Sequence, residues 1–140
     1  AVNIPASVQN IGSSSFSQTE NLESVIFEEG SLLEVIGFGA FEYCDSLKNI
    51  TLPAHLKAIG EWAFSSSSLE RVIFEEGSEL ETIDIGAFII SENLQTINIP
   101  SRVEIMSWVF DLTGCPEDIF TPGATIVNCR VTVETEGPIS

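Results

Sequence analysis

Hydrophobic and polar positions along the chain follow a pattern that returns several times. A unit opens with leucine and continues with two apolar residues, as in Leu47, Ile50 and Leu52. The last two alternate with polar residues at a period of two, which is typical of a strand with one buried face. A second apolar pair follows after a turn, such as Ile59 and Phe64. Each unit therefore predicts a strand, a turn and a second packed segment.

The units are copies of one another. Residues 22–41 and 69–88 align without a gap, 47 positions apart, and residues 2–16, 47–64 and 94–110 form a second, related version. A single unit is therefore 22 to 25 residues long, a period typical of leucine-rich solenoids, in which neighbouring units bury each other's apolar edges. We expect successive strands to stack into a parallel sheet. The leucines that open the units should form one row: Leu22, Leu47, Leu69 and Leu94.

The turn after the strand has two forms. In one, Pro53 or Pro100 ends the strand because proline has no N–H to donate. In the other, Glu-Glu-Gly-Ser provides Gly30 or Gly77, which can take a positive φ. We expect the second packed segment, with a small residue such as Ala63 before its Phe, to form a short helix or 3₁₀ turn. The fold prediction is an α/β solenoid of five to six repeats, with a parallel sheet on one face and short helices or 3₁₀ turns on the other.

Composition narrows the function classes. The 140 residues include 21 acidic and 5 basic side chains, a net charge of −16, which excludes most nucleic-acid binding because phosphate contacts need clustered Lys and Arg. Hydrophobic residues make up 44% and charged residues 19%, which does not fit a disordered acidic tail. No apolar run is long enough to predict a transmembrane segment.

The segments "LKNITLPAHLKAIGEWAF" (residues 47–64) and "IGFGAFEYC" (residues 36–44) resemble the BspA-like leucine-rich repeats. The resemblance covers Val2 to about Phe110 and rests on IP-x-x-V, then IG-x-x-AF, then Cys. It implies a secreted or cell-surface protein of bacteria or parasitic protists, and thus an extracellular or cell-surface location. Members of this family are associated with adhesion to host proteins and to other cells. The family's Cys after Phe is clear only at Cys44.

The repeat fades toward the C-terminus. We assign residues 1–114 to leucine-rich repeats, the first incomplete, and residues 115–140 to a degenerate final coil or cap that keeps an alternating apolar pattern through Val133. Cys115 and Cys129 can pair across this coil if the protein is secreted; the alternative is two buried free thiols. No cap is expected at the first repeat, so end-to-end self-association is a further expectation.

Catalytic chemistry has little support in the sequence. His55, the single histidine, lies in a repeat turn and is expected to be a surface residue rather than a base. The pairs Glu28–Glu29 and Glu75–Glu76 recur at the repeat offset, which indicates a structural position rather than a glycosidase pair. No cofactor or metal is expected, although clustered acids are compatible with weak calcium binding. Asn49-Ile50-Thr51 matches the N-glycosylation pattern; the alternative is two strand residues that point outward.

The exposed face of the predicted sheet is the candidate binding surface. We expect a non-enzymatic module that binds a protein ligand, such as an extracellular-matrix component or another cell surface, through a rigid platform. The alternative is a structural spacer or self-associating segment of a longer surface protein. A polysaccharide-degrading enzyme would need a unique acidic pair outside the repeat pattern. The residues expected to face outward are Ser24, Ile26, Glu28, Asn49, Thr51, Arg71, Ile73, Glu75, Thr96 and Asn98, with Asn3 as their equivalent in the first coil.

Overall fold

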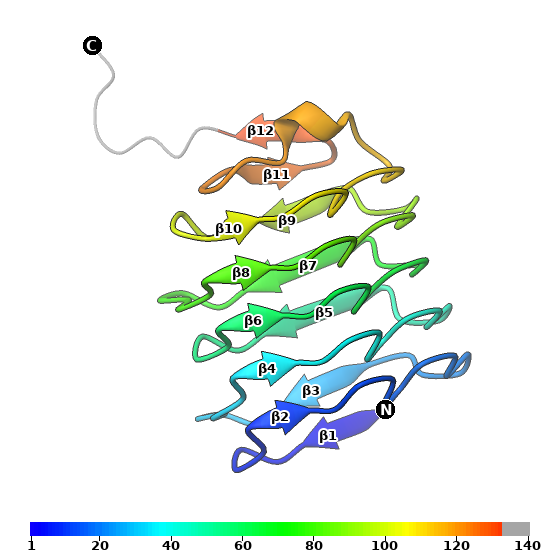
Figure 1. Ribbon diagram of the computed structural model, residues 1–140, viewed down its shortest axis with the longest axis vertical. Coiled ribbons are helices and arrows are strands. Elements are labelled where there is room, and N and C mark those ends of the chain that lie inside the picture. Colours follow the sequence, from blue (N-terminus) through cyan, green and yellow to red (C-terminus); the bar gives the residue numbers. More distant parts are fainter. Residues whose placement is uncertain (133–140) are drawn as a thin grey trace.

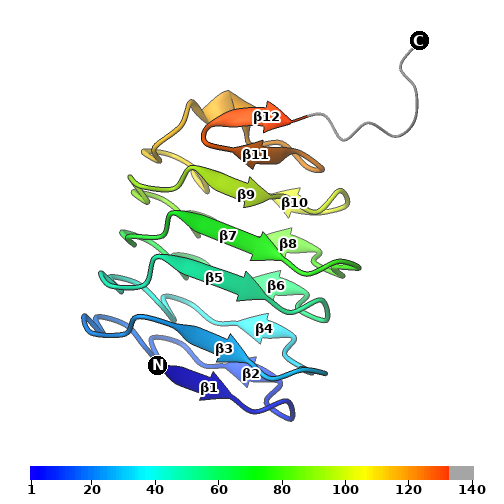
Figure 2. The same cartoon turned by 180° about the vertical axis from the view of Figure 1, so that it is seen from behind.

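The computed structural model describes residues 1–132 of the chain. The chain winds into a stack of coils, each with one strand on either side of the core (Figure 1). The first strand of each coil lies on the face turned toward the viewer in Figure 2, which we call the front sheet; hydrogen bonds join the first two of these strands and, separately, the last three. These strands are β1 (Val2–Ile4), β3 (Val25–Phe27), β5 (Asn49–Leu52), β7 (Arg71–Phe74) and β9 (Thr96–Asn98). The solenoid of stacked parallel strands is as the repeat predicts.

The second strand of each coil belongs to a continuous parallel back sheet. Each is only two residues long, and one residue of each contributes to the core, such as Ile36 and Ile59, both 0% exposed. Ile36 lies directly opposite Ile59, which lies opposite Ile83. The strands are β2 (Asn10–Ile11), β4 (Val35–Ile36), β6 (Ala58–Ile59), β8 (Thr82–Ile83) and β10 (Glu104–Ile105).

The prediction of short helices in this half of each repeat is wrong. Turns follow the back strand, and two residues in each turn take a positive φ, as Trp62 (58°) and Ser66 (53°) do in the third coil. Alternate N–H groups then point along the stack: those of Trp62, Phe64 and Ser66 donate to carbonyls of the next coil at 3.1, 2.7 and 2.9 Å. A helix would direct these donors into its own turns instead. The single helix within residues 1–132 is the 3₁₀ turn η1 (Glu117–Ile119), beyond the repeats.

Phenylalanine rings form a column through the core, which we call the aromatic column. Neighbouring rings are nearly parallel, with centroids 5.1 to 5.7 Å apart within the repeats. Phe120, which the repeat pattern does not include, stacks on the last ring at 4.3 Å and extends the column. The members are Phe16, Phe41, Phe64, Phe88, Phe110 and Phe120.

The leucines that open the units are all buried and occupy equivalent positions in successive coils. Leu22 is 4% exposed, and Leu47, Leu69 and Leu94 are 0% exposed. The register supports the row, since Ile50 lies opposite Val72, and Val72 lies opposite Ile97, each three residues after its leucine. The shared apolar core that the repeat predicts is therefore present.

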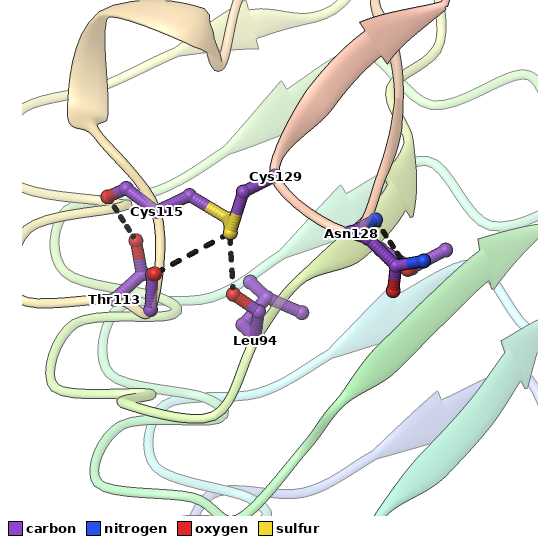
Figure 3. The surroundings of a disulfide bond; sticks show 7 residues. Leu94, Thr113, Cys115, Asn128 and Cys129 are labelled. Carbon is purple, nitrogen blue, oxygen red and sulfur yellow. Dashed lines mark hydrogen bonds between the residues drawn. A yellow bond between two sulfur atoms is a disulfide. The ribbon is translucent and has the colours of Figure 1, made fainter.

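The last strands cover the end of the front sheet. Strand β11 (Thr125–Val127) pairs antiparallel with β9, and β12 (Arg130–Thr132) pairs antiparallel with β11. A disulfide joins Cys115 to Cys129, so of the two alternatives the paired one is found (Figure 3). The Cys115 sulfur lies 3.4 Å from the carbonyl oxygen of Leu94. This is a contact rather than a hydrogen bond, because a disulfide sulfur carries no hydrogen. Val133, part of the predicted alternation, lies outside the described residues.

Candidate functional site

On each strand of the front sheet, every other side chain points to the outer face. On β5, Asn49 and Thr51 are exposed while Ile50 and Leu52 are buried, because successive side chains of a strand point to opposite faces. Ile26 on β3 is 53% exposed, so this face presents a large aliphatic side chain to solvent.

Strand register brings these outward residues into rows across the sheet. Asn49 lies opposite Arg71, and Arg71 lies opposite Thr96. Thr51 lies opposite Ile73, and in the first coil Asn3 lies opposite Ile26. We call the residues at the centre of this face the central patch: Ile26, Asn49, Thr51, Arg71 and Ile73. The central patch combines two aliphatic side chains, two neutral polar ones and a cation.

Two of the predicted site residues are engaged within the fold. The N–H of Ala6 donates to Oε1 of Glu28 at 3.2 Å, and the N–H of Ala54 donates to Oε1 of Glu75 at 3.1 Å. Each carboxylate therefore binds the main chain just after the proline of the preceding coil. This geometry gives the recurring glutamates a structural role, which explains their return at the repeat offset.

Asn98 is also engaged within the fold. The N–H of Phe74 donates to Oδ1 of Asn98 at 2.7 Å, and Nδ2 of Asn98 donates to the carbonyl oxygen of Phe74 at 2.8 Å. The Thr96 hydroxyl accepts from the N–H of Asn128 at 3.3 Å. Ser24 is partly buried at the edge of the face. These three residues are less available to a ligand than the central patch.

A hollow of about 280 Å³ opens on the outer face between β3 and β5. It is lined by residues of both strands, with Glu75 at its side. Four of its seven lining residues are predicted site residues, and the sequence does not predict the hollow itself: the four are Ile26, Asn49, Thr51 and Glu75. One available signal is the difference between Thr51 and Asn98, which occupy equivalent positions in two related units.

The turns beyond the front sheet carry a cluster of ionisable side chains. Nε2 of His55 lies 3.7 Å from Glu34, and its Nδ1 lies 3.6 Å from Glu79. Nζ of Lys57 donates to Oε1 of Glu79 at 3.1 Å, which lowers the pKa of the Glu79 carboxyl below its usual value and raises the pKa of Lys57. His55 therefore lies partly exposed between two carboxylates of neighbouring coils.

The described residues contain no group of three or more His, Cys, Asp or Glu side chains placed to hold a metal ion. No helix within residues 1–132 has the length and apolar character needed to cross a membrane.

The family model described as the BspA type leucine rich repeat region matches residues 1–115 in six copies. The chain belongs to the BspA-type leucine-rich repeat family. Among solved structures, the pneumococcal vaccine antigen PcpA is 36% identical, with a TM-score of 0.74 over 79% of this chain. A leucine-rich repeat protein from Bacteroides ovatus is 27% identical, with a TM-score of 0.56 over 78% of this chain. A search of curated protein sequences finds no match.

The matches span 27% of the PcpA chain and 34% of the Bacteroides ovatus chain. This BspA-type repeat chain therefore corresponds to only a part of each neighbour. Its fold agrees with the family assignment, because stacked leucine-rich units bury a common core and leave one sheet face exposed.

Proposed function

We propose that this BspA-type repeat chain is a non-enzymatic protein-binding module of a surface protein, and that the central patch contacts the ligand. The observation that carries the proposal is the 53% exposure of Ile26 on the outer face of the front sheet, where it lies opposite Asn3. Exposed aliphatic side chains beside polar groups and an Arg are typical of protein recognition surfaces.

The rigidity of the coil stack supports this function. The aromatic column and the back sheet continue through every repeat, so the central patch is held in place before a ligand arrives. A preformed surface loses little conformational entropy on binding, which leaves more of the contact energy as affinity.

Charge favours a particular kind of partner. The net charge of −16 attracts basic protein surfaces and repels nucleic acids. We propose a protein ligand of the extracellular matrix or of another cell, and an extracellular or cell-surface location, in keeping with the antigen PcpA. We also retain residues 1–114 as the repeat region and 115–140 as its cap, a role supported by Phe120 and the antiparallel strand β11.

The test is direct binding of purified fibronectin, laminin and collagen to the immobilised chain. The variant Ile26→Glu/Ile73→Glu places charge in the central patch and should abolish binding of the matrix protein that the wild type captures. Val35→Glu is the matched control, because Val35 is 36% exposed on β4 of the back sheet. Unchanged binding by the folded double variant would refute the choice of face.

The alternative function, a spacer or self-associating segment, predicts a different result. A spacer should bind none of these proteins, and a self-associating segment should show concentration-dependent sedimentation. Sedimentation of Ile26→Glu/Ile73→Glu and of Val35→Glu distinguishes a self-associating segment from a binding module. Self-association through the ends of the stack should not respond to changes in the central patch.

A further inference from the structure

The front sheet is interrupted between β3 and β5. Hydrogen-bonded ladders join β1 to β3, β5 to β7, and β7 to β9. Within residues 1–132, no ladder joins β3 to β5. The back sheet continues past the same point, from β2 through β4 to β6. The interruption therefore concerns only the outer face that carries the central patch.

Proline removes one main-chain donor at this junction, as it does at the junction of β7 and β9, which keeps its ladder. The coils alternate between the proline turn and the glutamate turn. When a glutamate coil follows a proline coil, the N–H of its first turn glutamate donates to the preceding strand. Glu28 donates to the carbonyl oxygen of Ile4 at 3.1 Å, and Glu75 donates to that of Leu52 at 3.0 Å. When a proline coil follows, Pro53 or Pro100 stands in this position and has no N–H to donate.

The N–H is missing at Pro53 and at Pro100, 47 positions apart. A side chain compensates for it only at the second of these places. At the second place, the carboxamide of Asn98 accepts from the N–H of Phe74 and donates to its carbonyl. At the first place, Phe27 stands where Phe74 does, and Thr51 stands where Asn98 does. The threonine side chain is one bond shorter than that of asparagine and carries a single polar atom, so it does not offer the separate donor and acceptor atoms of a carboxamide.

The main chain of Phe27 faces the gap. Phe27 lies opposite Ile4, and Ile4 bonds to the N–H of Glu28. In a parallel pair, a residue bonds to the two neighbours of the residue opposite it, so the N–H and C=O of Phe27 point away from β1 and toward β5. The hollow of about 280 Å³ opens at this point and is lined by Phe27 and Thr51.

We propose that this hollow binds a primary carboxamide, carried by an Asn or Gln side chain of the protein ligand, which pairs with the N–H and C=O of Phe27 as Asn98 pairs with Phe74. The inference rests on the proposed function, because it names the group that the ligand presents to the central patch.

Charged side chains and a trans peptide bond do not fit this pair of main-chain partners. A carboxylate has no hydrogen to donate to the carbonyl of Phe27, and Glu75 beside the hollow repels it. Lys and Arg cannot accept from the N–H. A trans peptide bond directs its N–H and C=O to opposite sides, whereas a primary carboxamide presents both on one edge.

The test uses the ¹⁵N-labelled chain and N-acetylasparagine N′-methylamide as the probe, with the leucine analogue as an apolar probe of similar shape. The asparagine probe should shift the amide signals of Phe27 and Thr51 in a saturable manner, and the leucine probe should not. Thr51→Asn supplies the carboxamide from the chain itself and should remove the response. Val35→Asn places the same side chain on the back sheet and should retain it. Absence of a saturable shift in the wild type, or an equal shift in Thr51→Asn, overturns the proposal.

The same variants separate this inference from the proposed function. A matrix protein whose binding is lost in Ile26→Glu/Ile73→Glu should bind Thr51→Asn roughly tenfold more weakly, since two hydrogen bonds are lost. Equal affinity for Thr51→Asn would reject the carboxamide site and leave the binding face standing. If no matrix protein binds but the asparagine probe still shifts Phe27, the carboxamide site stands and the proposed function fails.

Discussion

Replacing Phe64 by alanine should destabilise the protein more than the same change at Phe16. Phe64 is 0% exposed, and its ring lies 5.2 Å from the rings of Phe41 and Phe88 on its two sides. Phe16 is only partly buried and stacks on one ring, that of Phe41, at 5.1 Å. The two positions belong to the same aromatic column and differ both in burial and in the number of neighbouring rings.

The expected magnitude follows from burial and stacking. Removing a fully buried Phe side chain costs about 3–5 kcal/mol, including the cavity left behind. Each aromatic pair contributes about 0.5–1.5 kcal/mol beyond its buried area. Phe64→Ala breaks two pairs and opens a cavity within the stack, so we expect about 4 kcal/mol. Phe16→Ala breaks one pair beside solvent, so we expect about 1–2 kcal/mol.

Urea unfolding followed by far-ultraviolet circular dichroism measures both values. If the alanine variant at Phe64 is unfolded in the absence of urea, Phe64→Leu and Phe16→Leu give the same comparison with a smaller loss. Equal losses at the two positions would refute the reasoning, because they would show that neighbouring rings on both sides add nothing to the stability of a repeat.

Three other changes test separate parts of the structure. Asn98→Thr removes two hydrogen bonds to the main chain of Phe74 and should lower the free energy of unfolding by about 1–3 kcal/mol; an unchanged urea midpoint would contradict this. Burial raises the pKa of the Cys44 thiol, so iodoacetamide should modify it slowly in the folded protein and rapidly in urea; fast reaction of the folded protein would argue against a buried thiol. Replacing Cys115 and Cys129 by serine should cost about 3 kcal/mol, judged from the short loop that the disulfide closes, and a reduced protein with unaltered thermal stability would show that the cap does not depend on it.

The sequence predicts the stack because the repeated apolar positions have only one arrangement that buries them all. The row of leucines and the aromatic column within the repeats follow from this requirement. The prediction of helix in the back half of the repeat fails, because the main-chain donors of Trp62 and Phe64 bond to the next coil rather than within their own turn. The positive φ of Trp62 is not a local preference of tryptophan; inter-coil hydrogen bonds hold it there.

The candidate site was predictable in outline only. Alternation identifies which strand residues face outward, because it depends on the period of two. It does not show that Glu28 and Asn98 are engaged by the main chain of a neighbouring coil, since those partners are 22 and 24 residues away in sequence. The interruption beside Thr51 depends in the same way on how two coils meet, so it became visible only in the structure.

The interrupted front sheet and the continuous core are compatible because different parts of a coil hold the stack together. Between the second and third coils, the N–H of Phe41 still donates to Ala63 at 2.7 Å, and that of Gly60 to Ile36 at 2.7 Å. The aromatic column also crosses this junction without a break. A ligand that fills the hollow therefore has no core contacts to disrupt, and its binding should leave the back sheet unchanged. A front sheet closed by its own side chain, as at Asn98, would be more stable locally but would offer no such group to a partner.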